Sequence, residues 1–288
     1  MTKPAAKPVV WITGAGGLIG NYLIKLAPRF APQFEAVGLT RPQLDLLDLA
    51  TARAVFRSQE PAAIIHCAAL SKSPECQANP ALAHKVNVET TAMLADLAAE
   101  IPLLFFSTDL VFNGRNGNYV ETDAVEPLNV YAETKLAAEQ VVLAKPRHTV
   151  IRTSLNGGTS PTGDRGFNEQ MRRAWLAGQT LNLFNDEYRS PTPAEATARA
   201  TWELLLKNQT GVFHVAGAQK LSRAQIGEAL AARWPQLNPK FKVGSLKDYQ
   251  GAPRSPDTSL NCAKAQAQLS FPLPGLISWL NENPTEIF

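Results

Sequence analysis

The chain has 288 residues, of which 45% are hydrophobic and 18% are charged, and this length allows one large α/β unit or a nucleotide-binding domain with a smaller appendage. The formal net charge is only +3 and the basic residues are scattered, which argues against a nucleic-acid-binding surface. No apolar run approaches the ~20 residues needed to cross a bilayer, so we expect a soluble, cytoplasmic protein.

The first half of the chain alternates between short apolar runs and helical patterns. Apolar runs are typical of strands buried on both faces, and their alternation with helices indicates a parallel sheet of right-handed βαβ units. We expect strands at 9–13, 34–40, within 62–69, 101–109 and 148–154. We expect helices at 21–30 (ending near Pro28), 49–59, 80–100 and 130–144. The predicted fold class is α/β, a Rossmann-type doubly wound sheet forming an NADP(H)-binding domain over residues 1–154.

After residue 154 the pattern changes to loops, short strands and amphipathic helices. We expect a smaller, mainly substrate-binding domain over residues 155–288. The helix over 193–206 and the strand over 212–217 resemble the first half again, so we expect residues of about 192–217 to return to the main sheet. Further helices are expected at 167–178 and 221–234, and a short strand within 180–193.

A glycine-rich segment, TGAGGLIG (13–20), follows the first expected strand and opens the first helix. Its glycines, Gly14, Gly17 and Gly20, have the spacing GxxGxxG. Such a turn brings backbone N–H groups against a pyrophosphate and lets a helix pack close to a strand. The alternative is a glycine-rich turn that binds nothing.

The second expected strand ends at Thr40 and Arg41, without the carboxylate that usually binds the ribose 2′-hydroxyl of NAD. A hydroxyl and a guanidinium suit a 2′-phosphate, so NADP(H) is favoured over NAD(H). The alternative for Arg41 is a solvated loop arginine.

Two further patterns concern catalysis. Ser107, Thr108 and Asp109 end a strand at the edge where open α/β sheets bind ligands, although such residues also serve as caps. Tyr131 and Lys135, in YAETK, lie four apart and so share one face of a helix. A free phenol has a pKa of about 10, and we expect the nearby ammonium to lower the pKa of Tyr131 and make it a general acid. The alternative is an ordinary surface pair.

The order GxxGxxG, HCAA (66–69), STD (107–109) and YxxxK (131–135) resembles the extended short-chain dehydrogenases/reductases. Within them the chain is most similar to the dTDP-4-dehydrorhamnose reductase branch, through TRPQLDLLD (40–48), STDLVFNG (107–114), ETDAVEPLNVYAETKLAAE (121–139) and IRTS (151–154). The resemblance covers residues 9–192 well. It implies that Thr108 orients a keto oxygen, Tyr131 protonates it and Lys135 holds the nicotinamide ribose. It also implies cofactor contacts by Gly14, Gly17, Leu18, Ile19, Gly20, Thr40, Arg41, Asp45, Leu46, Cys67, Ala68, Ala69, Leu70, Asn87, Ser107, Tyr131, Lys135, Arg152, Thr153 and Ser154.

The substrate side departs from this branch. Leu110 and Leu155 stand where relatives have aromatic residues, and Leu110 cannot supply the acid that a dehydratase needs. We assign the substrate contacts to Asp109, Leu110, Leu155 and Arg254. Arg254 would bind a substrate phosphate, or else pair with a carboxylate such as Asp257.

These features predict an NAD(P)H-dependent reductase of a keto group on a sugar or sugar nucleotide. One alternative is an epimerase that retains its cofactor and consumes no NADPH overall. Another is a non-catalytic, cofactor-binding regulatory subunit of a partner enzyme. The three cysteines and four histidines lack ligand spacing, so we expect no metal, and we expect neither a nucleic acid nor a membrane as partner. The oligomeric state stays open, with a homodimer as one option.

Overall fold

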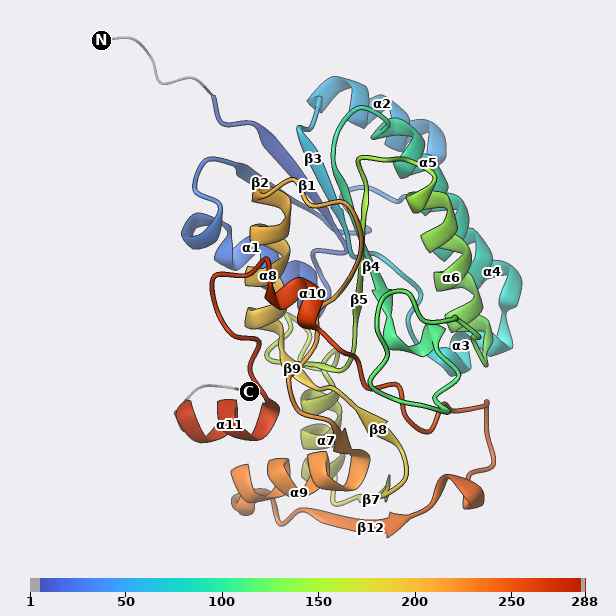
Figure 1. Ribbon diagram of the computed structural model, residues 1–288, viewed down its shortest axis with the longest axis vertical. Helices are drawn as coiled ribbons and strands as arrows, with labels where there is room; N and C mark the ends of the chain where they lie inside the picture. Colours follow the sequence, from blue (N-terminus) through green and yellow to red (C-terminus); the bar gives the residue numbers. More distant parts are fainter. Residues whose placement is uncertain (1–5, 286–287) are drawn as a thin grey trace.

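The computed structural model describes residues 6–285 and 288, and a six-stranded parallel sheet forms its centre (Figure 1). The strand order is β10-β5-β4-β3-β1-β2. This confirms the predicted α/β class, with a doubly wound sheet of the Rossmann type. The strands are β1 (Val9–Thr13), β2 (Glu35–Leu39), β3 (Ala63–His66), β4 (Leu103–Thr108), β5 (Thr149–Thr153) and β10 (Gly211–His214).

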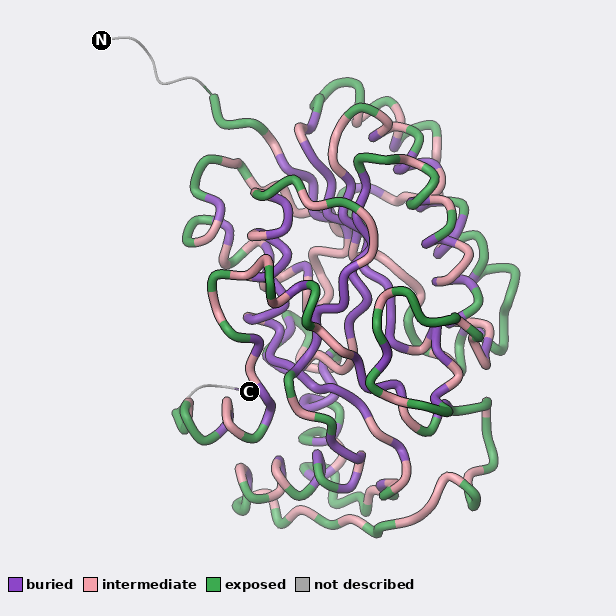
Figure 2. Tube along the Cα trace, in the orientation of Figure 1, coloured by how far each residue is buried: buried purple, intermediate pink, exposed green. Residues whose placement is uncertain are grey.

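Helices cover both faces of the sheet, because its apolar residues alternate between the two sides. Val10, Ile12 and Phe106 pack with α1 and α8, whereas Trp11, Phe105 and Val150 pack with the helices on the opposite face. Figure 2 shows the buried residues concentrated along these strands. The first face carries α1 (Leu18–Phe30), α8 (Ala194–Leu206) and α10 (Ala263–Gln266). The second carries α2 (Leu49–Gln59), α5 (Thr90–Leu97) and α6 (Val130–Leu143), with α3 (Ser73–Ala78) and α4 (Pro80–His84) packed on α6.

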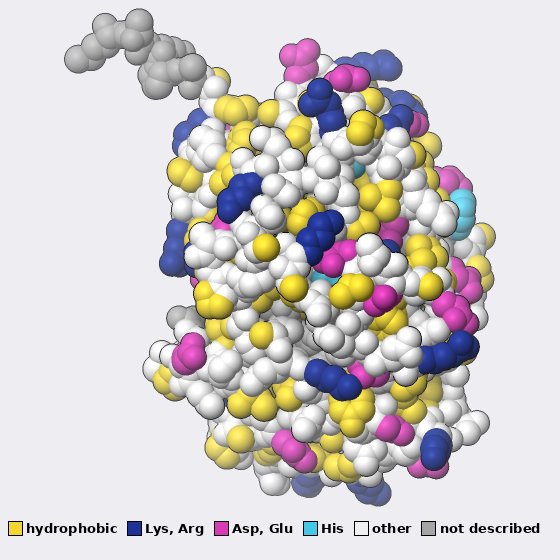
Figure 3. Space-filling model, in the orientation of Figure 1, with side chains coloured by type: hydrophobic (Ala, Val, Ile, Leu, Met, Phe, Trp, Pro, Cys, Tyr) yellow, Lys and Arg dark blue, Asp and Glu magenta, His cyan; other side chains and the backbone are white. Residues whose placement is uncertain are grey.

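The rest of the chain forms smaller elements beyond the carboxyl edge of the sheet, in the lower part of Figure 1. They enclose a second apolar cluster that includes Phe167, Trp175 and Leu230. Figure 3 shows basic and acidic side chains interspersed over the face that it draws. The helices are α7 (Phe167–Leu176), α9 (Arg223–Arg233) and α11 (Leu276–Glu282). The paired strands are β7 (Thr180–Phe184) with β12 (Lys240–Gly244), β8 (Tyr188–Arg189) with β11 (Leu221–Ser222), and β6 (Asn156–Gly157) with β9 (Thr192–Pro193).

Residues 194–214 return to the main sheet through α8 and through β10, which pairs in parallel with β5. Trp202 of α8 is fully buried and donates a hydrogen bond from Nε1 to the Leu23 carbonyl of α1 over 3.1 Å. The division of function between residues 1–154 and 155–288 stays a prediction.

Two helices differ from expectation. α1 begins at Leu18 rather than at residue 21. It includes Pro28, which removes one i→i−4 hydrogen bond but lies at an exposed position in the last turn, and Ala31 N still donates to Ala27 O over 2.8 Å. The helix expected over 80–100 contains a π-helical turn, Lys85–Glu89, between α4 and α5. Within the described residues, no helix is both long and apolar enough to cross a membrane.

The strand order reverses beside β1, because β2 lies on one side of it and β3 on the other. In open α/β sheets the crevice at such a switch point, at the carboxyl ends of the strands, is where ligands bind. The segments that follow β1 and β3 are therefore the first to consider as a binding site.

Candidate active site

Two glycines at the junction of β1 and α1, Gly14 and Gly20, have no room for a side chain. Gly14 has a φ of +68°, and a Cβ there would lie 2.7 Å from Ala68 N. A Cβ on Gly20 would lie 2.4 Å from the Gly14 carbonyl oxygen. Gly17 caps α1 without a side-chain hydrogen bond, and the first turn of α1 holds no acidic residue. An anion such as a pyrophosphate is favoured there.

A buried hydrogen-bond chain ties this turn to the second layer of helices. Thr91 donates to the Asn87 carbonyl over 2.7 Å, so its oxygen accepts from His66 Nε2 at 3.0 Å. His66 Nδ1 then accepts from the Thr13 hydroxyl at 2.6 Å. Burial, and secondly the charge of Lys135, lower the pKa of His66 to about 3. His66 is therefore a neutral structural link.

Tyr131 and Thr108 meet at the carboxyl edge of the sheet. Thr108 is the last residue of β4, and Tyr131 lies in the first turn of α6, which Asn129 caps by accepting from Ala132 N over 3.1 Å. Burial raises the pKa of Tyr131, and the Asp109 carboxylate raises it further, while the Thr108 hydroxyl beside the phenol lowers it. The phenol is thus fully protonated at neutral pH.

The expected lowering of the Tyr131 pKa by Lys135 is therefore wrong for the protein without its cofactor. Desolvation of the phenol and the field of Asp109 outweigh any effect of the ammonium. Lys135 is itself 3% exposed and lies 3.9 Å from the centre of the Phe105 ring. Burial lowers the pKa of Lys135 to about 7 against the raising effect of Glu139.

The residues at this edge fit a dinucleotide cofactor. The Ser107 hydroxyl is buried and has no hydrogen-bond partner in the described part of the chain. Lys135 Nζ likewise makes no hydrogen bond or ion pair with a described residue. Ser107 follows Phe105 by two positions on β4, so both face α6 and Lys135. Two unpaired polar groups beside a glycine cradle are what a bound polar molecule would satisfy.

The segment after β3 lies against the glycine turn, since a Cβ on Gly14 would meet Ala68 and Cys67. Cys67, Ala68, Ala69 and Leu70 are each partly exposed, although the strand before them is buried. Asn87 is 1% exposed and donates to Thr134 Oγ1 on α6 over 2.9 Å. Asn87 also bonds to the backbone of Leu70 and thereby links this segment to the helix that carries Tyr131 and Lys135.

The residues expected to select the cofactor lie on the surface after β2. Thr40 donates from N and Oγ1 to Gln43 Oε1, over 2.9 and 2.6 Å. The Arg41 side chain is 77% exposed and pairs with Asp45, whose Oδ2 lies 3.5 Å from Nε. Leu46 packs at the edge of the core. Arg41 is free to turn toward a phosphate because an exposed ion pair is weak.

The residues at the carboxyl end of β5 have other partners than the expected cofactor. The Arg152 guanidinium is buried in a bidentate ion pair with Glu139, at 2.7 Å between Nη2 and Oε2. The Thr153 hydroxyl accepts from Asn156 Nδ2, and the Ser154 hydroxyl donates to Asp109 Oδ2. The structure therefore does not support side-chain cofactor contacts for these three residues.

Asp109, expected to contact substrate, is instead buried inside the protein. Its Oδ2 accepts from Ser154 and Thr258, over 2.6 and 2.9 Å, and lies 3.8 Å from Arg189 Nε. The carboxylate therefore holds β4 to later parts of the chain, and a role in positioning Thr108 fits better than substrate contact. Leu110 follows it on a 3₁₀ turn and is partly exposed.

Arg254 belongs to a cluster of three arginines around Glu187. Arg254 Nε and Nη2 donate to the two Glu187 oxygens, each over 3.0 Å, and Arg189 Nη2 donates to Glu187 Oε1 over 2.9 Å. Burial lowers the pKa of Arg223 to about 10, against the raising effect of Glu187. The alternative that Arg254 pairs with a carboxylate is confirmed, but its partner is Glu187, while Asp257 pairs with Lys220.

Glu187 and Asp109 are the two carboxylates that act on this cluster. Three guanidinium groups therefore share two counter-charges. The Arg254 side chain is 35% exposed and lies near the rings of Phe184 and Tyr249. Leu155, the other expected substrate residue, packs at the edge of the second apolar cluster. The cluster is therefore suited to an anionic group.

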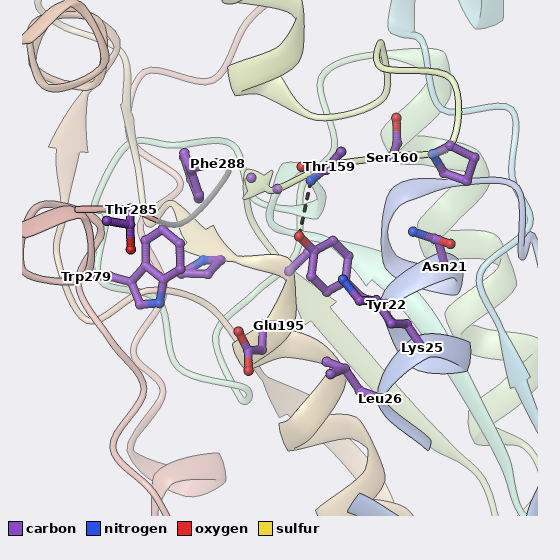
Figure 4. Close-up of a pocket in the computed structure, with 15 residues that line it drawn as sticks. Asn21, Tyr22, Lys25, Leu26, Thr159, Ser160, Glu195, Trp279, Thr285 and Phe288 are labelled. Atoms are coloured by element: carbon purple, nitrogen blue, oxygen red, sulfur yellow. Dashed lines mark hydrogen bonds between the residues drawn. The ribbon is translucent and has the colours of Figure 1, made fainter. Parts of the chain in front are cut away.

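A cavity of about 750 Å³ lies elsewhere, between α1 and the C-terminal segment (Figure 4). Tyr22 and Lys25 of α1 face Trp279 and Phe288 across it, and the Thr159 N–H donates to Tyr22 Oη over 3.2 Å. None of the three expected catalytic residues lines it.

Several residues around the site were missed from sequence. Glu139 continues the spacing of four that joins Tyr131 to Lys135, and that spacing could have identified it. Thr13 could have been found from its position immediately before Gly14. Glu187 and Arg223 carried no such signal, because their partners are distant in sequence.

A nucleotide cradle at the switch point, with a threonine, a tyrosine and a lysine along the same edge, is the arrangement of NAD(P)-dependent oxidoreductases of the extended short-chain dehydrogenase/reductase type. A narrower assignment comes from comparison with known families. Residues 9–282 match the family described as RmlD substrate binding domain. The chain belongs to this family.

Curated relatives include two different kinds of protein. The dTDP-4-dehydrorhamnose reductase of Mycobacterium tuberculosis (strain H37Rv) is 33% identical over 265 residues, covering 87% of this chain and 84% of the relative. Methionine adenosyltransferase 2 subunit beta of Rattus norvegicus is 28% identical over 273 residues, covering 89% and 81%. The chain is thus similar to a reductase and to an enzyme subunit.

Two solved structures are similar over nearly the whole chain. A hypothetical dTDP-4-dehydrorhamnose reductase from Sulfolobus tokodaii has a TM-score of 0.81 and 29% identity, covering 93% of this chain and 97% of that one. The dTDP-4-dehydrorhamnose reductase of Bacillus anthracis, in complex with NADP, has a TM-score of 0.85 and 23% identity, covering 96% and 98%. The second likeness shows the fold alone.

Proposed function

We propose that this protein uses NADPH to reduce a keto group of a nucleotide-linked sugar, with Tyr131 as the proton donor. The observation that carries the proposal is the pairing of a protonated Tyr131 phenol with the Thr108 hydroxyl, beside a lysine that has no partner among the described residues. At neutral pH the Tyr131 phenol carries the proton that a reduction requires. Its raised pKa makes it a weak acid, so proton transfer depends on a nearby charge, that of Lys135, to stabilise the phenolate.

The roles of the residues follow from their positions. Bound at the β1–α1 turn, a nicotinamide cofactor would supply the hydride. Thr108 would donate a hydrogen bond to the keto oxygen and fix its direction. Tyr131 would transfer its phenolic proton to that oxygen as negative charge develops on it. The Lys135 ammonium would bind ribose hydroxyls and stabilise the phenolate that Tyr131 becomes.

The choice of a nucleotide-linked sugar depends on the arginine cluster. A diphosphate would supply the counter-charge that Arg189, Arg223 and Arg254 do not receive from Glu187 and Asp109. The relatives named dTDP-4-dehydrorhamnose reductase support the same class of substrate. The preference for NADPH is supported by the exposed guanidinium of Arg41, which could pair with a 2′-phosphate.

The proposal can be tested by following NADPH oxidation with a panel of keto-sugars, free and nucleotide-linked. We expect stoichiometric oxidation with a nucleotide-linked member and none with the corresponding free sugar. Tyr131→Phe should then reduce turnover at least about a hundredfold, the usual contribution of a general acid, while NADPH still binds. Full turnover by Tyr131→Phe would exclude Tyr131 as the donor.

A second candidate function, a cofactor-binding subunit of another enzyme, is favoured by the 28% identity to methionine adenosyltransferase 2 subunit beta. Such a subunit would bind NADPH but consume none with any keto-sugar. It would also bind a catalytic subunit in analytical ultracentrifugation, and Tyr131→Phe would not change that binding. Stoichiometric NADPH consumption excludes this function as the sole one.

A further inference from the structure

A buried ionic group lies directly behind Lys135. Tyr131, Lys135 and Glu139 are spaced by four on α6, so all three occupy one face of the helix. Lys135 and Glu139 are 3% and 1% exposed. A carboxylate one helical turn from an ammonium, with water excluded from both, interacts with it far more strongly than an exposed pair would.

Arg152 fixes the Glu139 carboxylate in this place. Arg152 Nε donates to both Glu139 oxygens, over 3.0 and 3.2 Å, and Nη2 adds a bond of 2.7 Å to Oε2. The guanidinium also lies 5.1 Å from the centre of the Phe112 ring. This fork geometry permits one orientation of the carboxylate.

His214 holds Arg152 from the other side. Nδ1 of His214 lies 3.0 Å from the Tyr119 carbonyl and 3.2 Å from the Asn261 carbonyl. Since carbonyls only accept, Nδ1 carries the proton, and Nε2 is left to accept from Arg152 Nη1 at 3.5 Å. Burial lowers the pKa of His214 to about 4, so the ring is neutral and adds no repelling charge.

Other titratable groups near Lys135 are uncharged at neutral pH. Burial lowers the pKa of His66 to about 3 and raises the pKa values of Cys67 and Tyr131. Glu139 is therefore the one negative group, among those described, that acts on Lys135 at neutral pH.

We infer that Glu139 is a positioning residue that keeps Lys135 charged, and that Arg152 limits how strongly it does so. The inference rests on the proposed function, in which Lys135 must carry its proton. Glu139 attracts the ammonium, and Arg152, paired behind it, partly cancels that attraction. Removing one partner or the other must therefore shift the titration of Lys135 in opposite directions.

The test is the titration of Lys135 by NMR, in full-length protein carrying ¹³Cε-labelled lysine and without cofactor. Lys135→Met identifies the resonance. Glu139→Gln should move the midpoint to lower pH, and Arg152→Gln to higher pH, each by about one unit or more. Glu133→Gln removes an exposed acid from the same helix and should leave the midpoint where it is.

Either single variant leaves a buried charge unpaired, which destabilises the fold. The double variant Glu139→Gln/Arg152→Gln removes both charges and should still lower the midpoint, because Glu139 is the nearer group. A midpoint unchanged in the double variant, or shifted in the same direction in both single variants, would overturn the inference.

Steady-state kinetics test the inference about Glu139 a second time. They also distinguish its failure from a failure of the proposed function. In the reductase assay, the fall of kcat at alkaline pH should move with the Lys135 midpoint in each variant. If the midpoints shift as expected but no keto-sugar is reduced, the proposed function fails and the electrostatic inference stands. If turnover is confirmed but the midpoints do not shift, the inference fails alone.

Discussion

The side chain of Asn87 forms a closed pair of hydrogen bonds with the backbone of Leu70. The Leu70 N–H donates to Asn87 Oδ1 over 2.8 Å, and Asn87 Nδ2 donates to the Leu70 carbonyl over 3.1 Å and to Thr134 Oγ1 over 2.9 Å. Thr134 lies between Tyr131 and Lys135 on α6. Asn87 therefore fixes the distance between the segment after β3 and the helix that carries Tyr131.

Asn87→Ala should impair both stability and catalysis. Three hydrogen bonds are lost and the Leu70 N–H is left without its partner, although the Leu70 carbonyl still accepts from Cys76 Sγ. We therefore expect the free energy of unfolding to fall by about 2 to 4 kcal/mol. We also expect kcat to fall at least about tenfold, because small misplacements of reacting groups are costly. Denaturant unfolding and steady-state kinetics measure the two effects.

Asn79→Ala is the matched control. Asn79 caps α4 at an exposed position, accepting from Leu82 N over 3.0 Å. Its loss should lower the free energy of unfolding by about 1 kcal/mol and leave kcat unchanged. An equal fall of kcat in both variants would mean that general destabilisation, and not the position of α6, limits the reaction.

Gly14→Ala should abolish tight cofactor binding. The new methyl group would lie 2.7 Å from Ala68 N and 2.8 Å from the Cys67 carbonyl carbon, so the segments after β1 and β3 would be forced apart at the crevice. We expect the Kd for NADPH, measured by fluorescence titration, to rise at least about tenfold, the effect of a 1.4 kcal/mol change.

Gly163 provides the control for backbone strain. Its φ of +66° is close to that of Gly14, but a Cβ there would meet nothing within 4 Å. Gly163→Ala should carry a similar backbone penalty with unchanged NADPH affinity. If Gly163→Ala weakened binding as much as Gly14→Ala, close packing at Gly14 would not be the cause.

The sequence predicted the parts of this site that depend on neighbours along the chain. The glycine turn, the end of β4 and the Tyr131–Lys135 spacing all follow from local geometry, and these segments lie at the expected edge of the sheet. The Tyr131 pKa was predicted in the wrong direction because burial cannot be read from a spacing of four. Arg152 was assigned to the cofactor because its partner Glu139, on another element, could not be recognised.

Arg41→Ala should reduce the preference for NADPH over NADH. The Arg41 side chain is 77% exposed and its ion pair with Asp45 is weak, so its main loss would be a charged contact to the 2′-phosphate. Such a contact contributes about 1.5 to 3 kcal/mol, so we expect the ratio of the Kd for NADH to that for NADPH to fall at least about tenfold. Isothermal titration with each cofactor gives this ratio.

Arg115→Ala is the control for Arg41. Its side chain is 72% exposed and pairs with Glu126 at 3.2 Å between Nη2 and Oε1, so the two arginines have similar surroundings. The ratio of the two Kd values should stay at the wild-type value in Arg115→Ala. A wild-type ratio in Arg41→Ala would mean that other residues determine the preference for NADPH over NADH.

Arg254→Gln should weaken binding of nucleotide-linked substrates selectively. The substitution removes the most accessible positive charge of the cluster around Glu187, so we expect KM for a nucleotide-linked keto-sugar to rise at least about tenfold, with kcat within about twofold. Arg199→Gln is the control, since Arg199 also pairs with a carboxylate, Glu203, and lies over a ring, Phe271, but on α8. Unchanged KM in Arg254→Gln would exclude Arg254 from phosphate recognition. A fall in kcat without a change in KM would instead mean that Arg254 does not bind the substrate. It would then act indirectly, through Glu187, on the position of Thr108.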